Sequence, residues 1–325
     1  MSPQVTALMP AYERPKMMAE ALLSALSQTY DALTILIGDN SDSDDIEHLV
    51  KSFDDPRVKY FRNSPAVSPQ ENWVNLANMA KTPYIASLHD DDVWEPDFLA
   101  RTVQAMKENP GTKMVFTDYS IIDSDSTLLN AFTDKVYAWH YRDTLKEGPL
   151  NLDIEAGIRL AVVWNCPQPA YAALLDTKYV QSVDFLPEMA PLYDIWLSYQ
   201  MAIDEQPMYY ISDRLTRYRV HNQSLTSNSF ALAEDRVFNH VINSHPDLDV
   251  ALELEDRWAD LRWGRATKLM FEEEGRSFSQ EEFAQAVSGL HGRRKLAAWL
   301  GANSSLVWNG MRWIKQSKTV PVTTA

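Results

Sequence analysis

Short apolar runs alternate with amphipathic stretches throughout residues 5–88, and few folds accept this order. The runs at 5–9, 33–37, 58–61 and 84–88 have the length and composition of buried β-strands. The stretches between them carry apolar residues at helical spacing. Strands that alternate with helices in this way predict an α/β fold with a mixed, mainly parallel sheet flanked by helices.

The same two patterns continue beyond residue 88, although less regularly. Residues 120–170 carry scattered aromatic side chains and no clear period, so no element is predicted there. After Ser229 the chain is predicted to be helical, with Pro246 as the clear interruption before Gly275. The other predicted elements are helices at residues 15–26, 44–53, 72–80, 99–107 and 193–202, strands at 114–116 and 208–211, and an extended segment at 217–221.

Composition excludes several classes of protein. The formal net charge of −15 over 325 residues argues against a general nucleic-acid binder, which needs a basic surface. The ten glycines are scattered and form neither a dinucleotide-binding GxGxxG nor a P-loop. Cys166 is the one cysteine, which excludes an internal disulfide and a multi-cysteine metal site. No apolar run reaches the ~20 residues of a membrane span and no signal peptide is recognisable, so a cytoplasmic protein is predicted.

Polar residues follow the ends of three predicted strands. Tyr12 follows the first, Asp39 the second and the run from Asp90 to Asp92 the fourth, and the carboxyl ends of parallel strands share one edge of a sheet, where ligands bind. Three adjacent carboxylates repel one another unless a cation neutralises them, and Mg²⁺ or Mn²⁺ takes one or two carboxylates together with phosphate oxygens. If this segment is extended, Asp90 and Asp92 share a face and Asp91 points away. An acidic turn that caps the following helix is the structural alternative, but the position at a strand end favours a cation site.

Segments near the first and fourth strands carry recognisable runs. The segment from Val5 to Asp45 contains Pro-Ala-Tyr-Glu-Arg at 10–14 and Ile-Gly-Asp-Asn-Ser at 37–41, and residues 83–96 read Pro-Tyr-Ile-Ala-Ser-Leu-His-Asp-Asp-Asp-Val-Trp-Glu-Pro. In this order and at these separations they resemble the opening and the metal-binding DxD segment of the family 2 glycosyltransferases. The resemblance covers roughly residues 3–225 and implies the GT-A fold, a Rossmann-like α/β architecture.

The resemblance implies a role for each matching residue around the nucleotide. Pro10, Ala11 and Tyr12, followed by Glu13, would form the loop under the base and ribose, with Tyr12 stacked on the base. Asp39 would accept a hydrogen bond from the base, which favours uracil or thymine because both carry an N3–H donor. Gly-Asp-Asn-Ser is also ordinary turn chemistry, so a purely local turn is the alternative for Asp39.

The same resemblance implies a metal site in the acidic run. Asp92 would bind Mn²⁺ or Mg²⁺, which bridges the diphosphate. Asp90 and Asp91 would hold ribose, sugar or a metal-bound water, and Asp90 is also a candidate metal ligand. His89 is expected to pack below the site instead of binding metal.

Two further segments contribute candidates. The run Tyr-Arg-Val-His at 218–221 resembles the segment that closes the catalytic domain, where His221 would ligate the metal or contact the diphosphate and Arg219 would offset the charge of the leaving group. Asn72 matches a nucleotide-binding asparagine of the family. Glu71 stands where the family often has a basic residue, so the diphosphate contact is unassigned.

Inverting glycosyl transfer needs one general base that takes the proton of the acceptor hydroxyl. The resemblance places an acidic pair before a helix like the one predicted at 193–202, but Pro191 and Leu192 stand at the matching positions. Either Asp194, in the first helical turn, or Glu188, in the preceding loop, would therefore serve as the base. A residue that merely favours the start of the helix is the alternative for Asp194.

The C-terminal part has a charge pattern of its own. From Phe283 onward the sequence holds no acidic residue, and its six lysines and arginines give a charge of +6. The basic, tryptophan-containing segment 290–318 is typical of interfacial amphipathic segments, which predicts peripheral contact with the inner face of a membrane and access to a lipid-linked acceptor. The alternatives are tryptophans packed on the acidic body and an oligomer interface, and the oligomeric state is left open.

Together these features predict a metal-dependent, inverting glycosyltransferase of family 2. It would move a sugar from a nucleoside diphosphate donor, with UDP favoured and dTDP and GDP open, to a hydroxyl acceptor in the synthesis of cell-surface polysaccharide or another glycoconjugate. The predicted domains are a GT-A domain at 1–225, with a nucleotide-sugar half (1–118) and an acceptor half (119–225), and a helical region at 226–325. A non-catalytic sugar-nucleotide-binding protein is the alternative, and a nucleotidyltransferase is disfavoured because the loop after the first strand lacks glycines.

Overall fold

The computed structural model describes residues 4–221 and 230–269. The strands are β1 (Val5–Ala11), β2 (Leu33–Asp39), β3 (Val58–Arg62), β4 (Tyr84–Ser87), β5 (Val93–Trp94), β6 (Met114–Ile122), β7 (Gly148–Leu150), β8 (Ala173–Asp176) and β9 (Met208–Arg219). The helices are α1 (Pro15–Leu26), α2 (Asp45–Phe53), α3 (Pro69–Met79), α4 (Phe98–Glu108), α5 (Asn130–Trp139), α6 (Ile154–Ile158), α7 (Thr177–Ser182), α8 (Tyr193–Ile203), α10 (Phe230–Ser244) and α11 (Asp249–Leu269). Short 3₁₀ or π turns lie at η1 (Arg142–Thr144), η2 (Arg159–Val163) and η3 (Pro187–Met189).

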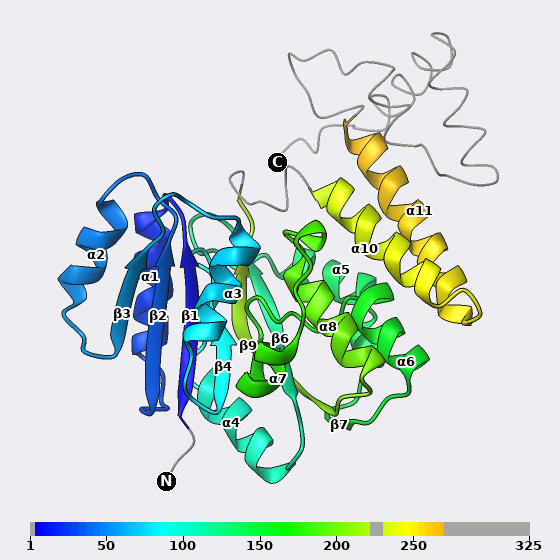
Figure 1. The fold of residues 1–325 in the computed structure, drawn as a ribbon, viewed down its shortest axis with the longest axis horizontal. Coiled ribbons are helices and arrows are strands. Elements are labelled where there is room, and N and C mark those ends of the chain that lie inside the picture. The colour runs from blue at the N-terminus through cyan, green and yellow to red at the C-terminus, as the bar shows by residue number, and fades with distance from the viewer. Residues whose placement is uncertain (1–3, 222–229, 270–325) are drawn as a thin grey trace, which may run out of the picture. The chain divides into compact units, whose positions relative to one another are not determined.

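These strands form one mixed sheet in the order β3-β2-β1-β4-β8-β6-β9-β5, with β7 paired to β9 (Figure 1). β1 is parallel to β2 and β4, β2 is parallel to β3, and β6 is parallel to β9. β8 runs antiparallel between β4 and β6. The predicted mixed, mainly parallel sheet flanked by helices is confirmed.

The two faces of the sheet bury different hydrophobic clusters. Ala7 and Met9 of β1 belong to the cluster that includes residues of α1, α2 and α4, whereas Leu8 belongs to the cluster that includes residues of α3 and α8. Figure 1 shows α3 in front of the strands and α1 behind them. Because successive side chains of a strand point to opposite faces, a strand covered on both faces must be apolar throughout. This explains why β1 and β2 are mostly apolar, with one threonine in each run.

The observed elements differ from the predicted ones in three places. α3 begins earlier than predicted because Ser68 caps it, accepting a hydrogen bond from the Glu71 N–H at 3.1 Å. The predicted strand at 208–211 and extended segment at 217–221 form one strand, β9, whose middle is polar and exposed. α5 and η2 lie within the stretch 120–170, for which no element was predicted, and the short strand β8 just beyond it was not predicted either.

The chain divides into two compact units after His240. The predicted domain boundary at 225 and the predicted basic segment at 290–318 lie outside the described residues. α10 and α11 are separated between Ser244 and Asp249, so the predicted helical region with a break near Pro246 is confirmed for residues 230–269. No helix of the described residues is long and apolar enough to cross a membrane.

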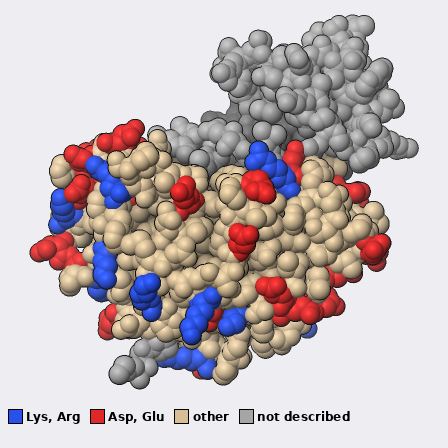
Figure 2. Space-filling model, viewed as in Figure 1, with Lys and Arg blue, Asp and Glu red and all other residues tan. Residues whose placement is uncertain are grey.

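Charged side chains are scattered on the face of the molecule drawn in Figure 2. Acidic and basic groups are interspersed there, with uncharged surface between them. The net negative charge of the chain is therefore not gathered into a single patch on this face.

Candidate functional site

The carboxyl ends of β1, β2 and β4 lie at one edge of the sheet, as the alternating pattern predicts. In the ladder between β1 and β2, Ala11 pairs with Asp39 and Pro10 with Gly38, so both strands end at the same level. β4 runs parallel to β1 and leads into the acidic run. The loops after β1 and β2 and the acidic run therefore share one edge.

The acidic run forms a turn, not the predicted extended segment. The Asp92 N–H donates to the carbonyl oxygen of His89 at 3.3 Å. Asp90 faces the loop after β1, where the Tyr12 N–H donates to its Oδ2 at 2.8 Å. Asp92 faces the end of β9, where the Arg219 N–H donates to its Oδ1 at 2.9 Å. The prediction that Asp90 and Asp92 share a face is wrong, because the backbone reverses between them.

A guanidinium group neutralises part of this turn. Arg14, directly before α1, places Nη2 2.6 Å from Asp90 Oδ1 and Nη1 2.5 Å from Asp91 Oδ2. The same Asp91 oxygen lies 3.0 Å from His221 Nε2. Sequence reasoning expected a divalent cation here and gave Arg14 no role. Its place in the same run as Tyr12 was the available signal, but a sequence does not show where a long side chain points.

The turn also contains a group of atoms that fits a divalent cation. Asp92 Oδ2 is buried and has no hydrogen-bond partner among residues 4–221 and 230–269. Donor atoms of His89, Asp91 and Asp92 all lie within 4.8 Å of one another. Carboxylate oxygens suit Mn²⁺ or Mg²⁺, and an imidazole nitrogen among the ligands favours a transition metal such as Mn²⁺ over Mg²⁺. His89, which was expected to pack below the site, thus lies near enough to the two carboxylates to be a candidate ligand, and its role stays untested. Asp90, a predicted ligand, lies outside this group, and His221, another predicted ligand, reaches it through Asp91.

The three carboxyl groups titrate differently because their surroundings differ. Burial, together with the nearby charge of Asp91, raises the pKa of Asp90 to about 7, and Arg14 only partly opposes this. Burial and the Asp91 charge likewise raise the pKa of Asp92 well above its ordinary value. Burial acts in the same direction on Asp91, but the hydrogen bond from His221 and the charge of Arg14 bring its pKa below the ordinary value. Arg14 therefore compensates the turn only partly, which leaves it receptive to a cation.

The first turn of α8 is tied to the acidic turn. The Tyr193 hydroxyl lies 2.5 Å from His89 Nε2, and Trp73 stacks on the Tyr193 ring with centroids 4.7 Å apart. Asp194 is the next residue, half-buried, and burial raises the pKa of its carboxyl group. Glu188 is exposed on η3. Of the two predicted bases, Asp194 is thus the one whose helix is linked to the acidic turn. The link is made by Tyr193, and nothing in the sequence indicated this contact.

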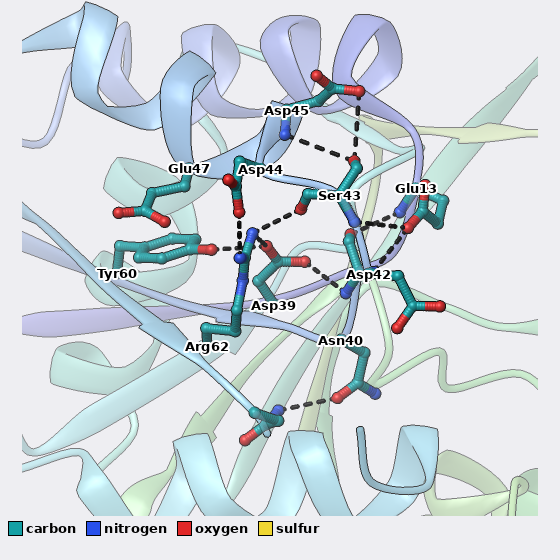
Figure 3. A network of polar contacts seen from close by, with 12 residues as sticks. Glu13, Asp39, Asn40, Asp42, Ser43, Asp44, Asp45, Glu47, Tyr60 and Arg62 are labelled. Atoms are coloured by element: carbon teal, nitrogen blue, oxygen red, sulfur yellow. Dashed lines mark hydrogen bonds and ion pairs between the residues drawn. The ribbon is translucent and has the colours of Figure 1, made fainter. Parts of the chain in front are cut away.

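Asp39 lies in a polar network between β2, β3 and the start of α2 (Figure 3). Its side chain is 0% exposed. The Ser41 N–H donates to Oδ1 at 2.8 Å, the Tyr60 hydroxyl donates to Oδ2 at 2.7 Å, and Arg62 Nη2 lies 3.6 Å from Oδ2. The local turn is thus present, and a contact between Asp39 and a base stays a prediction. Tyr12, by contrast, is 55% exposed at the same edge.

Three other predicted binding residues hold the scaffold in this structure. The Glu13 carboxylate accepts hydrogen bonds from backbone N–H groups of the loop after β2, the nearer at 2.7 Å. The buried Asn72 donates to the carbonyl oxygen of Gly38 at 2.7 Å. Arg219 is buried and pairs with Glu20 at 2.6 Å. These contacts position the edge of the sheet, and direct contacts of the three residues with a nucleotide stay predictions.

Residues 6–158 match the model of glycosyl transferase family 2. The predicted resemblance to the family 2 glycosyltransferases is thereby confirmed for this part of the chain. A GalNAc(5)-diNAcBac-PP-undecaprenol beta-1,3-glucosyltransferase of Campylobacter jejuni is 29% identical over 136 residues, which are 41% of this chain and 43% of the relative. A UDP-Glc:alpha-D-GlcNAc-diphosphoundecaprenol beta-1,3-glucosyltransferase of Escherichia coli is 25% identical over 228 residues, which are 70% of this chain and 81% of the relative. The matches span 27%, 43% and 48% of the first three curated relatives.

Two solved structures of other proteins have the same fold. TarS 1–349 of S. aureus in complex with UDP-GlcNAc has a TM-score of 0.63 and 11% identity, covering 97% of this chain and 92% of TarS 1–349. The mannosyltransferase PcManGT of Pyrobaculum calidifontis, in complex with GDP-Man and Mn²⁺, has a TM-score of 0.57 and 14% identity, covering 96% of this chain and 85% of the other. The predicted GT-A fold is thereby confirmed.

Proposed function

We propose that this chain is a metal-dependent, inverting glycosyltransferase that moves a sugar from a nucleoside diphosphate to a hydroxyl group of a lipid-linked acceptor. The observation that carries the proposal is the buried, unpartnered Oδ2 of Asp92 beside Asp91 and His89. A buried carboxylate oxygen without a partner is costly, and a bound divalent cation would offset that cost. The group also lies at the strand edge where α/β proteins bind ligands.

The donor is proposed to be a UDP-sugar. The exposed ring of Tyr12 offers a stacking surface beside Asp90, whose carboxylate accepts from the Tyr12 N–H. The Escherichia coli relative is named for UDP-Glc, and the S. aureus structure holds UDP-GlcNAc. The Pyrobaculum calidifontis structure holds GDP-Man, so GDP and dTDP donors stay open.

The acceptor is proposed to be a sugar on a polyprenyl diphosphate. The Campylobacter jejuni and Escherichia coli relatives are both named for acceptors on undecaprenol diphosphate. Attachment to the inner face of a membrane through residues 290–318, which lie outside the described residues, belongs to the same proposal.

Asp194 is proposed as the general base, with Glu188 as the alternative. It would take the proton of the acceptor hydroxyl as that oxygen bonds to the anomeric carbon and the bond from this carbon to the diphosphate oxygen breaks. Attack on the face opposite the leaving group inverts the anomeric centre. The raised pKa of Asp194 strengthens it as a base. A Mn²⁺ or Mg²⁺ ion held by Asp91, Asp92 and His89 would supply positive charge to the departing diphosphate.

Calorimetric titration of UDP, dTDP, GDP and CDP, with and without Mn²⁺, tests the donor site. Wild type should bind UDP with a Kd that Mn²⁺ lowers, and Asp92→Asn should weaken UDP binding in Mn²⁺ at least about tenfold because a metal ligand is lost. Asp31→Asn is the matched control, since this exposed aspartate precedes β2 at the opposite end of the strand. Full metal-dependent binding by Asp92→Asn would contradict the proposed site.

Turnover is tested separately, by release of UDP from UDP-sugars in the presence of a saccharide on polyprenyl diphosphate. Product NMR should show a changed anomeric configuration. Nucleotide binding without any turnover over a panel of donors and acceptors would favour the non-catalytic alternative.

A further inference from the structure

Arg14 is a candidate for the contact with the diphosphate, for which the expected basic residue is absent at position 71. Position 71, where a basic residue was expected for this contact, is Glu71, exposed in the first turn of α3. Arg14 directly precedes α1 on the sheet edge that also carries Tyr12. Its side chain is 17% exposed, so it faces the buried turn and is still reachable from solvent.

The Arg14 guanidinium is held by the carboxylates of the acidic turn. Nη2 and Nε donate to Asp90 Oδ1 and Oδ2 at 2.6 and 3.3 Å. Nη1 donates to Asp91 Oδ2 at 2.5 Å and lies 3.4 Å from His221 Nε2. Arg14 thus bonds to Asp91, one of the residues of the candidate metal group.

The other basic groups around the turn do not take over this role. The Arg219 guanidinium pairs with Glu20 at 2.6 Å and otherwise donates to Ser126 and to backbone carbonyl oxygens, so it neutralises no carboxylate of the turn. The His89 ring is engaged elsewhere, since its Nε2 lies 2.5 Å from the Tyr193 hydroxyl. Within the part of the chain that the structure describes, Asp92 Oδ2 keeps no hydrogen-bond partner.

We propose that Arg14 is a diphosphate-binding residue that holds Asp90 and Asp91 while no nucleotide is bound. The inference rests on the proposed function. A divalent cation and the guanidinium would share the Asp91 carboxylate, and two cations on one carboxylate repel each other. A diphosphate offers the guanidinium a bidentate anionic partner and so frees the carboxylate. Metal and nucleotide therefore bind with positive cooperativity through Arg14.

Calorimetric titration of the full chain with Mn²⁺ alone tests the competition. Arg14→Gln should bind Mn²⁺ at least about fivefold more tightly than wild type, because the competing cation is gone. Arg101→Gln is the matched control, since it removes one arginine from a surface pair with Asp213 and should leave the Mn²⁺ affinity unchanged. Equal or weaker Mn²⁺ binding by Arg14→Gln would overturn the competition and make Arg14 a structural counter-ion.

Titration with UDP in saturating Mn²⁺ tests the diphosphate contact. Arg14→Gln should lose at least about fivefold in UDP affinity, and the factor by which Mn²⁺ improves UDP binding should shrink. Arg14→Lys keeps the charge without the bidentate geometry, so its UDP affinity should fall between the two. Arg14→Lys also replaces Arg14→Gln as the test variant if circular dichroism shows that Arg14→Gln does not fold.

The outcomes separate the two proposals. If wild type binds UDP and both Arg14 variants bind it equally well, the inference is overturned and the proposed function still stands. If wild type binds no nucleotide, with or without Mn²⁺, both the proposed function and the proposed diphosphate contact are overturned.

Discussion

Asp194 and Glu188 differ in surroundings, although either could act as a base by chemistry alone. Asp194 is half-buried at the start of the helix that Tyr193 ties to His89. Glu188 is exposed, and its backbone carbonyl accepts a hydrogen bond from Arg236 at 3.0 Å. Burial raises the pKa of Asp194, and a base with a raised pKa is stronger but is protonated at a higher pH than an ordinary aspartate.

Asp194→Asn is expected to lower kcat by about 10²-fold or more, because the acceptor proton loses its base. UDP binding should not change. In wild type, kcat should fall as the pH drops through the raised pKa of Asp194, because its protonated form cannot accept the proton. UDP release measured between pH 5 and pH 8 tests both points. Glu188→Gln is the control, and a large loss of kcat there with little effect at Asp194 would reassign the base.

The acidic turn shows how far residues can be assigned from sequence. The triplet at 90–92 and its position at a strand end were predictable, because a buried strand followed by charged residues has a recognisable pattern. The reversal that separates Asp90 from Asp92 was not, because a turn depends on hydrogen bonds such as the one from Asp92 N–H to His89. The pairing of Arg14 with the turn is a tertiary contact between residues far apart in sequence, so no local pattern encodes it.

Among the secondary-structure elements, the ones buried on both faces were the predictable ones. β1 and β2 are mostly apolar because helices cover both sides of them. α5 has no such pattern, because the residue that it buries fully is the polar Thr133, which accepts from the Ile121 N–H, and the Tyr137 hydroxyl donates to the Tyr119 carbonyl oxygen. Its apolar Phe132 is instead 43% exposed. A helix that turns polar side chains toward the protein cannot be predicted from the spacing of apolar residues.

The contact between β2 and α3 yields a stability prediction. A Cβ at Gly38 would lie 2.2 Å from Asn72 Oδ1, so Gly38→Ala should lower the free energy of unfolding by ~1–3 kcal/mol. Asn72→Ala should also destabilise, because the Gly38 carbonyl loses its donor. The double variant should cost less than the sum, since the overlap disappears. Urea unfolding of all four proteins completes the cycle, and strict additivity would show that the backbone avoids the overlap in another way.

For the whole molecule, the division after His240 separates the site from the C-terminal part of the chain. Every candidate site residue lies between positions 10 and 221, and both large hydrophobic clusters are built from residues 5–220. The first unit thus contains the sheet, its cores and the acidic turn.

A chain that ends at Ser244, which keeps α10 whole, should fold cooperatively and bind UDP with the same Kd as the full chain. Its association with vesicles that contain anionic lipid should be lost, because the basic segment 290–318 is removed. Thermal unfolding, calorimetry and vesicle sedimentation measure the three properties. Aggregation without a cooperative transition would show that the first unit needs the rest of the chain.

The closeness of Gly38 and Asn72 also limits the order in which related sequences can diverge. A lineage that first replaces Gly38 passes through a protein in which a side chain overlaps the Asn72 amide. A lineage that first shortens Asn72 loses a hydrogen bond but removes the closest overlap, so that a Cβ at position 38 then meets Leu76 Cδ1 at 3.2 Å as its nearest remaining contact. The order of the two substitutions therefore matters: a change at Asn72 in α3 eases a later change at Gly38 in β2, whereas the reverse order passes through the overlapping protein.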